Sequence, residues 1–340
     1  MPTPFALNGL GRIGRAVLRL AADRPEVQPV AINDPAPTAS LVARLAHDSV
    51  RGPLAHGVRP EGDGLRLGEH WIRHFRQAEP AEIPWHQSGA RLVVEASGRF
   101  LGEAARSHLG ESVERVVLSA NSDHADVTLC PGINDHGNLY DPRRHRLVSA
   151  SSCTTNCLAP VLAVLDAAGG IERAAFTSVH SYTPSQKLFD EPGEGEGDDR
   201  RRRAAALNLI PLASTTPAAI GRVLPHLAGR VDGRVVRVPT PAGALLEVTA
   251  HLSHNTEAEA LRGAFRRAAE NSLRGILAVT EDALVSSDFI HRPESAIIDL
   301  PLLGLTDGRL ARVAAWYDNE WGYAHRLLDL IVRLGGDTEV

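Results

Sequence analysis

The chain has 340 residues and a formal net charge of -5, with hydrophobic and charged fractions of 43% and 23% that are ordinary for a globular protein. This length predicts two domains, and the composition excludes disordered, coiled-coil and collagen-like chains. No apolar run reaches the roughly 18 residues of a membrane helix, and the acidic balance gives no electrostatic basis for nucleic-acid binding.

The three cysteines, Cys130, Cys153 and Cys157, are too few and too unevenly spaced for a disulfide framework. No further Cys/His pair is spaced to complete a metal site with them. Residues 1–7 lack the basic and apolar segments of a secretory signal. We therefore expect a reduced, cytoplasmic protein without a bound metal.

Short apolar runs alternate with helical spacing up to about residue 150. Strands are expected at 5–7, 27–32, 92–95, 116–118 and 147–149. Residues 13–22 have the apolar spacing of a helix. Such alternation predicts βαβ units and a parallel sheet, so the fold class is α/β. We expect this first domain to span 1–151 and to be completed by a C-terminal helix at 320–340.

The second domain is expected over 152–319, with a helix at 154–168 followed mainly by strands. These strands are expected at 175–182, 234–239, 245–252, 275–280 and 296–300. The stretch 305–317, with Asp307-Gly308 near its start, is typical of a hairpin. The pattern predicts an α+β domain with a large mixed or antiparallel sheet.

Asn8-Gly-Leu-Gly-Arg-Ile-Gly14 is a G-x-G-x-x-G motif between an expected strand and an expected helix. In that context Gly9 permits a tight turn, Gly11 lets the backbone approach a pyrophosphate, and Gly14 lets helix and strand pack closely. The amino end of the helix then presents N–H groups to the phosphates. The motif predicts a Rossmann-type doubly wound dinucleotide-binding domain.

Asp34 follows Gly14 by 20 residues, at the end of the second expected strand. A carboxylate at that place binds the ribose 2′-hydroxyl and repels a 2′-phosphate. The predicted cofactor is therefore NAD rather than NADP.

Cys153 lies in Ser151-Ser-Cys-Thr-Thr155, at or near the amino end of the helix expected from residue 154. That setting lowers the pKa of a thiol, so Cys153 is a candidate nucleophile, with a buried structural cysteine as the alternative. Cys157 and Cys130 are expected to be packed in the core.

A thiolate nucleophile needs a base or an ion-pair partner. Among 15 histidines, His180 is the best local candidate, because its strand-like segment runs into a polar loop. A structural histidine is the alternative. The loop itself, residues 191–203, is acidic and glycine-rich and then basic, so it is either a solvated loop or one that reaches a ligand or a neighbouring subunit.

Six segments of the chain form a set whose spacing extends along essentially its whole length: Asn8–Arg15, Ile32–Asp34, Ala150–Pro160, Val179–Thr183, Arg237–Pro241 and Trp316–Tyr323. Together, and in register, they resemble the phosphorylating glyceraldehyde-3-phosphate dehydrogenase family. The cysteine and tryptophan segments are highly specific. Erythrose-4-phosphate dehydrogenases share most of these motifs.

The resemblance implies a covalent mechanism. Cys153 would attack the aldehyde to give a thiohemiacetal, with His180 as base and later as hydrogen-bond donor to the oxyanion. Hydride transfer to the nicotinamide would leave a thioester, which phosphate or water resolves.

The resemblance also implies binding residues. The implied cofactor residues are Gly9, Gly11, Arg12, Ile13, Gly14, Asp34, Ser97, Ser119 and Asn319, the last holding the nicotinamide amide. The implied substrate-phosphate residues are Thr183 and Arg237, with Ser185 as a helper. The implied residues for the attacking phosphate are Ser152, Thr154, Arg201, Ser214 and Thr215. Pro192 falls in the loop that reaches a neighbouring subunit in the family, which implies a homotetramer.

The chain departs from the family pattern around the attacking-phosphate site. Thr215 replaces a glycine, and Pro217 removes an N–H and biases Thr216 toward extended geometry. Ala242-Gly243-Ala244 stands where Asn-Val-Ser is usual, Asn121 replaces a proline, and the acidic loop is longer than usual. These changes leave the acyl acceptor and the exact aldehyde open.

The leading hypothesis is the glycolytic, NAD-dependent oxidation of D-glyceraldehyde 3-phosphate with inorganic phosphate to 1,3-bisphosphoglycerate. One alternative is a paralogue that oxidises another phosphorylated aldehyde, such as erythrose 4-phosphate, with water as acceptor. Another is a non-catalytic NAD-binding or regulatory protein.

Overall fold

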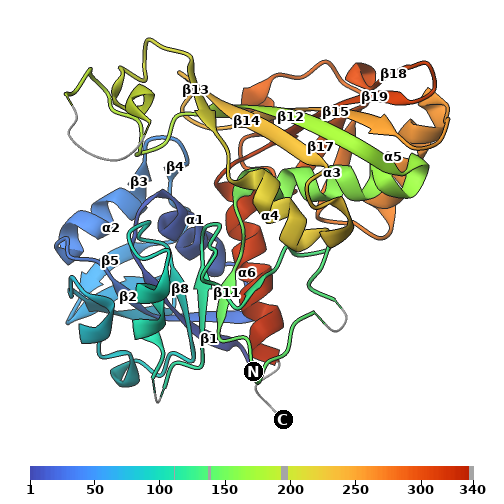
Figure 1. The fold of residues 1–340 in the computed structure, drawn as a ribbon. Coiled ribbons are helices and arrows are strands. Elements are labelled where there is room, and N and C mark those ends of the chain that lie inside the picture. Colours follow the sequence, from blue (N-terminus) through green and yellow to red (C-terminus); the bar gives the residue numbers. More distant parts are fainter. Residues whose placement is uncertain (111, 137–138, 193–197, 337–340) are drawn as a thin grey trace. The chain divides into compact units, whose positions relative to one another are not determined.

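The structure, a computed structural model, describes residues 1–110, 112–136, 139–192 and 198–336 (Figure 1). Unit 1 comprises Met1–Pro131, Asp135–Ser152 and the chain from Ala324, and unit 2 comprises Gly132–Asn134 and Cys153–Tyr323. Parts of two predicted segments, 193–197 of the loop and 337–340 of the last helix, lie outside the described residues. No described helix is long and apolar enough to span a bilayer.

Unit 1 is built on a nine-stranded sheet in the order β10-β11-β9-β8-β1-β2-β7-β6-β5. The strands are β1 (Thr3–Asn8), β2 (Val27–Asn33), β5 (Val58–Glu61), β6 (Gly64–Leu67), β7 (His70–Phe75), β8 (Leu92–Glu95), β9 (Arg115–Leu118), β10 (Val127–Thr128) and β11 (Leu147–Ser149). Neighbours from β10 to β7 pair in parallel, whereas β5, β6 and β7 pair antiparallel. The predicted parallel α/β sheet is confirmed.

The remaining elements of unit 1 connect these strands. They are α1 (Arg12–Ala21), α2 (Thr38–Ala46), the pair β3 (His47–Asp48) and β4 (Gly52–Pro53), and the 3-10 helices η1 (Pro80–Glu82), η2 (Trp85–Gln87) and η3 (Glu103–His108). The parallel strands are short, almost purely apolar runs because both of their faces are buried, as in β8 and β9. The antiparallel edge β5–β7 and helix α2 were not predicted.

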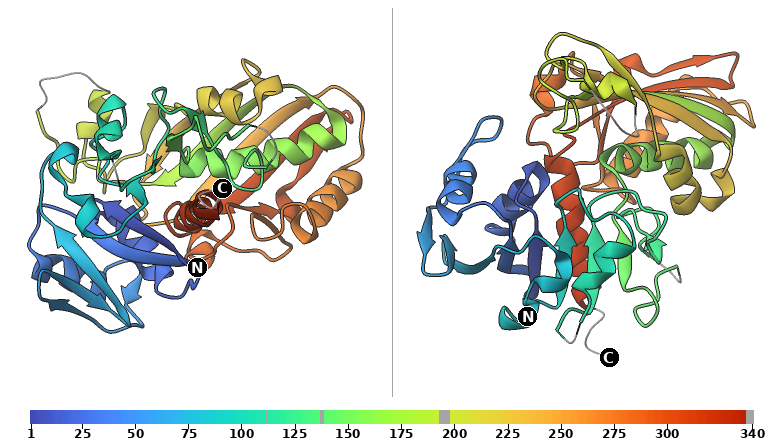
Figure 2. Two further views of the ribbon diagram at one scale, coloured as in Figure 1. Left: turned by 90° about the horizontal axis from the view of Figure 1, so that it is seen from below. Right: turned by 60° about the vertical axis from the view of Figure 1, so that its left-hand side comes forward.

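Helix α6 (Trp321–Gly335) adds its residues from Ala324 onward to unit 1 (Figure 2). Its apolar residues Leu327, Leu330 and Leu334 are fully buried. Asp329 accepts hydrogen bonds from Arg24 at 3.3 Å, and the carbonyl of Leu334 accepts one from Arg115 at 3.2 Å. The C-terminal segment therefore packs with the N-terminal part of the chain.

Unit 2 is built on a mixed eight-stranded sheet in the order β13-β14-β12-β15-β19-β17-β16, with β18 paired to β19. The strands are β12 (Ile171–Ser181), β13 (Ile210–Ala213), β14 (Val231–Val238), β15 (Ala244–Leu252), β16 (Leu277–Thr280), β17 (Ala296–Asp299), β18 (Gly304–Thr306) and β19 (Leu310–Tyr317). The pairs β12–β14 and β16–β17 are parallel, and the other pairs are antiparallel. The predicted large mixed sheet is confirmed.

Three helices pack against the strands of unit 2, as Figure 1 shows: α3 (Cys153–Gly169), α4 (Thr216–Val223) and α5 (Ala258–Glu270). The short 3-10 helices are η4 (Asp199–Arg202), η5 (Pro225–Leu227), η6 (Ser286–Phe289) and η7 (Leu300–Leu302). The predicted hairpin is present: Asp307 and Gly308 have φ of 49° and 65°, the left-handed pair that a type I′ turn requires. Helices α4 and α5 were not predicted.

Candidate active site

Cys153 is the first residue of α3, directly after a strained turn. Strand β11 ends at Ser149, and Ser151 adopts φ of 60°, a conformation that is uncommon for a residue with a side chain. The Ser151 hydroxyl donates to Asn121 Oδ1 at 2.8 Å, so the asparagine that replaces the usual proline stabilises this turn. The turn brings a half-buried thiol to the amino end of the helix.

The structure brings Cys153 and His180 together. Cys153 Sγ lies 3.4 Å from His180 Nε2, within hydrogen-bonding distance for sulfur. His180 is near the end of β12 and is only 2% exposed. Cys130 and Cys157 are buried in the core, as predicted, and Cys153 is the most exposed of the three thiols.

The other ring nitrogen of His180 has three polar neighbours, of which Ser181 Oγ, at 3.5 Å, is the most distant. Nδ1 lies 2.7 Å from the Ser181 carbonyl and 2.5 Å from Arg237 Nη1, and Arg237 Nη1 also donates to that carbonyl at 3.2 Å. If Nδ1–H donates to Ser181, Nε2 accepts the thiol proton; if Arg237 donates to Nδ1, the proton is on Nε2. The arrangement therefore supports both tautomers, one suited to a base and one suited to a donor.

Burial sets the protonation of this pair. Burial and the charge of Arg237 lower the pKa of His180 to about 3, against the raising effect of the Ser181 carbonyl. Burial also raises the pKa of the Cys153 thiol, opposed by Arg237 and by hydrogen bonds with Thr154. The expected lowering of the thiol pKa was therefore wrong, because desolvation outweighs the favourable charge. Burial thus disfavours the charged form of both groups, whereas Arg237 favours a thiolate and disfavours an imidazolium.

Tyr317 contacts the His180 ring directly and contacts Thr154, the residue that follows Cys153. Its hydroxyl lies 2.8 Å from Ser178 Oγ and 3.1 Å from Thr154 Oγ1, and its ring meets the His180 ring edge-on at 5.9 Å. Sequence reasoning assigned no role to Tyr317 or Ser178. The only sequence signal was the position of Tyr317 inside the tryptophan motif.

Asn319, predicted to hold the nicotinamide amide, has a defined orientation. Its Oδ1 accepts from Ser181 Oγ at 3.1 Å and from the Gly243 N–H at 3.0 Å. Gly243 has φ of 84°, which suits glycine, and this explains one departure from the family pattern. With Oδ1 occupied, the Asn319 amide can offer a ligand only its NH₂ donors.

Thr183 and Arg201 meet at Ser185. The hydroxyls of Thr183 and Ser185 lie 3.0 Å apart, and Arg201 Nη1 donates to Ser185 Oγ at 3.0 Å. Residues predicted for two different phosphates are thus linked through the predicted helper residue.

Arg237 Nε is buried and lacks a hydrogen-bond partner among the described residues, as do several other arginine Nε atoms.

The altered segment 214–217 is less disruptive than expected. Thr215 has φ of -84°, a conformation open to any residue, so replacing glycine causes no strain. Thr216 is the first residue of α4 rather than extended, because Pro217 falls in the first helical turn, where a missing N–H is tolerated. Ser214 Oγ accepts from the Thr216 N–H at 3.2 Å. Ser152 is half-buried in unit 1, and Thr154 is buried in α3.

In unit 1 the glycine motif has the geometry that a dinucleotide needs. Gly9 has φ of 92°, and a Cβ there would lie 2.5 Å from Ser97 Cα; a Cβ on Gly14 would lie 2.2 Å from the Gly9 carbonyl oxygen. Gly11 is the N-cap of α1 without a side-chain cap, and a Cβ there would meet open space. The bare amino end of α1, with Arg12 and Ile13 in its first turn, therefore fits a pyrophosphate.

The other predicted cofactor residues surround this turn. Asp34 accepts from the Leu10 N–H at 3.0 Å and from the Ala36 N–H at 3.0 Å. Ser119 donates through its hydroxyl to the Glu95 carbonyl at 2.9 Å. Ser97 donates to the Glu95 carboxylate. The residues present thus fit NAD, and Glu95 is a residue that sequence reasoning missed, although a charged side chain ending an apolar strand was a signal.

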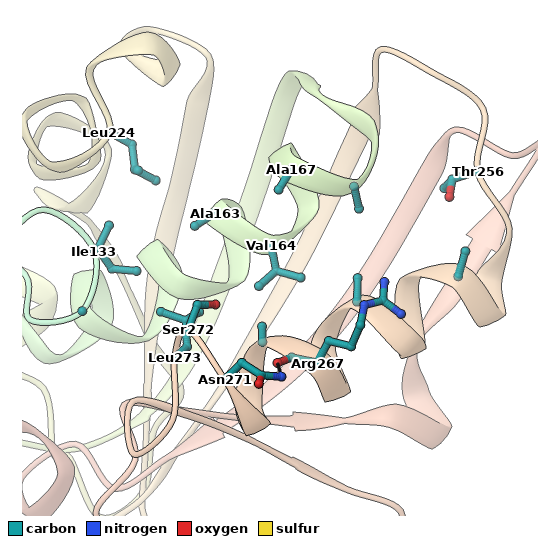
Figure 3. Close-up of a pocket in the computed structure, with 15 residues that line it drawn as sticks. Ile133, Ala163, Val164, Ala167, Leu224, Thr256, Arg267, Asn271, Ser272 and Leu273 are labelled. Carbon is teal, nitrogen blue, oxygen red and sulfur yellow. Dashed lines mark hydrogen bonds between the residues drawn. The ribbon is translucent and has the colours of Figure 1, made fainter.

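A separate pocket of about 650 Å³ lies between α3 and α5 (Figure 3). Its lining includes Ala163, Val164 and Ala167 of α3, with Arg267 and Asn271 on the other side. None of the predicted site residues is among the described residues that line it. The pocket therefore has no part in the arrangement around Cys153.

A dinucleotide-binding fold and a neighbouring cysteine and histidine are typical of an NAD-dependent oxidoreductase. Two family models match the chain: "Glyceraldehyde 3-phosphate dehydrogenase, NAD binding domain" over residues 3–103 and "Glyceraldehyde 3-phosphate dehydrogenase, C-terminal domain" over residues 152–319. The chain belongs to the glyceraldehyde-3-phosphate dehydrogenase family, as the resemblance predicted.

Curated relatives agree along nearly the whole chain. The glyceraldehyde-3-phosphate dehydrogenase of Kitasatospora aureofaciens is 43% identical over 331 residues, 97% of this chain and 98% of the relative. Glyceraldehyde-3-phosphate dehydrogenase 1 of Streptomyces avermitilis is 40% identical, covering 99% of this chain and 100% of the relative. The protein of that name in Bacillus subtilis is 40% identical, covering 97% of each.

Proposed function

We propose that the chain oxidises D-glyceraldehyde 3-phosphate with NAD and inorganic phosphate, giving 1,3-bisphosphoglycerate and NADH. The observation that carries the proposal is the 3.4 Å approach of Cys153 Sγ to His180 Nε2, with Arg237 beside the opposite ring nitrogen. Family membership and full-length relatives of that name support the same activity.

The first step is addition of the thiol to the aldehyde. Cys153 Sγ forms a bond with the carbonyl carbon while Nε2 of His180 takes the thiol proton. The proton on Nε2 then forms a hydrogen bond to the developing alkoxide, which stabilises the thiohemiacetal. Burial and Arg237 lower the pKa of His180, so the imidazole is neutral before the reaction. The negative charge that develops on sulfur as the thiol loses its proton then favours the protonated imidazole beside it.

Oxidation of the thiohemiacetal requires NAD, and the bound nicotinamide supplies the hydride acceptor. Returning the alkoxide to a carbonyl releases the hydride and leaves a thioester on Cys153. Asn319 would hold the carboxamide of the cofactor through its NH₂ group, since Oδ1 is engaged by Ser181 and Gly243. Phosphate then attacks the thioester carbonyl, the C–S bond breaks, and the thiolate leaves and regains its proton.

The phosphate of the substrate would be held by Thr183 and Arg237. The guanidinium of Arg237 supplies positive charge and several oriented N–H donors, which suit a phosphate dianion. We assign the attacking phosphate to Ser152, Thr154, Arg201, Ser214 and Thr215.

One observation favours a second candidate, in which water resolves the thioester. Thr215 and Pro217 replace a bare backbone and an N–H donor in the segment proposed for the attacking phosphate. The relaxed geometry of that segment nevertheless keeps the Ser214 hydroxyl in place, so phosphate remains the proposed acceptor.

The test is NADH formation from glyceraldehyde 3-phosphate and from erythrose 4-phosphate, each with and without inorganic phosphate. Phosphate-dependent turnover of the triose supports the main proposal. Phosphate-independent turnover, or preference for the tetrose, supports the second candidate instead. If neither substrate gives NADH, both proposals are contradicted and the alternative of a non-catalytic NAD-binding protein is favoured.

We further propose a homotetramer. Apolar side chains on both sides of the loop 191–203 are exposed. Phe189 precedes the loop and is 74% exposed, and Leu207 and Leu209 follow it and are 83% and 70% exposed. Such side chains favour burial against another copy. Light scattering on the purified protein tests this: a mass near 36.4 kDa, that of a single chain, would contradict the proposal.

A further inference from the structure

Glu95 lies where the order of strands in the sheet of unit 1 reverses, between β1 and β8. It ends β8, and its register partner Asn8 ends β1, so the two side chains meet at the carboxyl ends of adjacent parallel strands. Because β2 lies on the far side of β1, this is the topological switch point, where open α/β sheets bind ligands. Glu95 is 0% exposed and Asn8 is 3% exposed.

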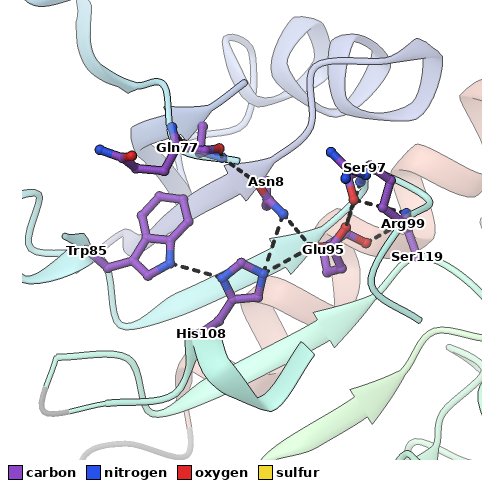
Figure 4. A network of polar contacts seen from close by, with 9 residues as sticks. Asn8, Gln77, Trp85, Glu95, Ser97, Arg99, His108 and Ser119 are labelled. Atoms are coloured by element: carbon purple, nitrogen blue, oxygen red, sulfur yellow. Dashed lines mark hydrogen bonds and ion pairs between the residues drawn. The ribbon is translucent and has the colours of Figure 1, made fainter. Parts of the chain in front are cut away.

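The Glu95 carboxylate accepts hydrogen bonds from four groups (Figure 4). Oε1 accepts from the Ser97 N–H at 2.7 Å and from the Ser97 hydroxyl at 2.5 Å, and Oε2 accepts from Asn8 Nδ2 at 2.5 Å and from His108 Nε2 at 3.0 Å. Four donors match the accepting capacity of one carboxylate. A buried acid is tolerated here because its oxygens are fully bonded.

The neighbours of the carboxylate are themselves fixed. Trp85 Nε1–H donates to His108 Nδ1 at 3.1 Å, so the imidazole must have its proton on Nε2, facing Glu95. Asn8 Oδ1 accepts from Asn33 Nδ2 at 2.8 Å, which turns the Asn8 NH₂ group toward the carboxylate. Both His108 and Asn8 are therefore fixed with an N–H group directed at the Glu95 carboxylate.

This network joins the segments proposed to hold NAD. Asn8 directly precedes the Gly9 turn, and Gly9 packs so closely on Ser97 that a Cβ would come within 2.5 Å of the Ser97 Cα. The backbone carbonyl of Glu95 accepts both the N–H and the hydroxyl of Ser119, at 3.0 and 2.9 Å. One residue thus ties together the glycine turn, Ser97 and Ser119.

We propose that Glu95 is a positioning residue for NAD, holding the Gly9 turn and the Ser97 turn at their binding separation before the cofactor arrives. The inference rests on the proposed assignment of Gly9, Ser97 and Ser119 to the cofactor. Ordering these loops in advance spares the entropy that binding would otherwise lose. Glu95 acts through its neighbours and takes no part in the bond changes at Cys153.

The first test replaces the carboxylate by an isosteric amide, Glu95→Gln. One oxygen becomes an NH₂ group that faces existing donors, so we expect the Kd of NAD to rise at least about tenfold. The KM for NAD should rise alike, while kcat at saturating NAD, the KM for the aldehyde and the alkylation rate of Cys153 without NAD stay near wild type. The matched control is Glu69→Gln, an exposed residue of unit 1.

The second test separates positioning from simple stability. Asn8→Asp alone would set two carboxylates against each other and should abolish NAD binding. In the double variant Asn8→Asp with Glu95→Gln, the amide of residue 95 donates to the new carboxylate, so NAD affinity should recover to within about tenfold of wild type. This recovery is expected even if Glu95→Gln alone folds poorly.

Two results would overturn the proposal: an unchanged Kd of NAD in folded Glu95→Gln, or a double variant no better than the worse single variant. A lowered melting temperature with unchanged Kd would likewise leave Glu95 a structural residue only. If the wild-type protein itself fails to bind NAD, the cofactor assignment fails first, and that result is distinct from all of these.

Discussion

Arg237 Nη1 lies 2.5 Å from His180 Nδ1, on the side of the imidazole opposite Cys153. The contact follows from strand pairing, because His180 of β12 and Arg237 of β14 are direct partners in a parallel register. A residue predicted to bind substrate phosphate therefore also acts on the proposed base. Its positive charge opposes protonation of His180 and favours ionisation of Cys153.

Removing this charge should change the pH dependence of the thiol. In Arg237→Gln we expect the pKa of His180 to rise from about 3, since Arg237 is one cause of its lowering, and the pKa of Cys153 to rise further. The iodoacetamide reaction of Cys153 should then begin at higher pH than in wild type. The exposed neighbour Arg234→Gln, also on β14, is the control. Superimposable profiles for wild type and Arg237→Gln would show that the charge does not govern the pair.

Loss of the sulfur should stop the reaction without disturbing the cofactor domain. In Cys153→Ser we expect the rate of NADH formation to fall at least about a thousandfold, because a neutral hydroxyl is a poor nucleophile without a strong base. NAD affinity, measured by titration calorimetry, should stay close to wild type. Near-native turnover in this variant would exclude the covalent mechanism.

Asp34 should select NAD over NADP through its charge. It also bonds the Leu10 N–H, so the isosteric Asp34→Asn change tests charge with less disturbance of the turn than alanine would cause. Removing the repulsion of a 2′-phosphate should raise the ratio of kcat/KM for NADP to that for NAD by about tenfold. An unchanged ratio would remove Asp34 from the proposed cofactor residues.

The parts of the fold that sequence reasoning recovered depend on local chemistry. The glycine motif needs a tight turn and close packing at Gly9 and Gly14, and the Asp307-Gly308 turn needs two positive φ values. Strands β8 and β11 matched their predicted bounds, because each is a short apolar run that ends in one polar residue, Glu95 or Ser149. In contrast, α5 is amphipathic and bounded by no glycine or proline, so its ends carried no strong local signal.

The contacts around the proposed site could not be predicted from the sequence, because they depend on tertiary structure. The pairing of His180 with Arg237 and of Asn8 with Glu95 arises from strand order and register, which join residues 57 and 87 positions apart. The pKa of Cys153 depends on burial as well as on the helix end, and the degree of burial is a tertiary property. Sequence reasoning proposed Cys153 and His180 as nucleophile and base, but it gave no indication of the residues that surround them.

Asp48 should contribute to stability above acidic pH. Burial raises the pKa of its carboxyl, but bonds from the Arg51 and Val50 N–H groups and from Arg15 outweigh this and lower it to about 2. Because the folded pKa lies below the unfolded one, the stabilisation is complete above about pH 4 and disappears as pH falls toward 2.

We therefore expect Asp48→Asn to lower the free energy of unfolding at pH 7 by about 1 kcal/mol, after allowance for solvent screening. The difference from wild type should shrink as pH falls from 4 toward 2, measured by urea unfolding followed by circular dichroism. Asp63→Asn is the control, since its side chain is 65% exposed beside Arg73 and should change stability little at any pH. A difference between wild type and Asp48→Asn that stays constant between pH 7 and pH 2 would mean that the bonds to Asp48 do not depend on its charge.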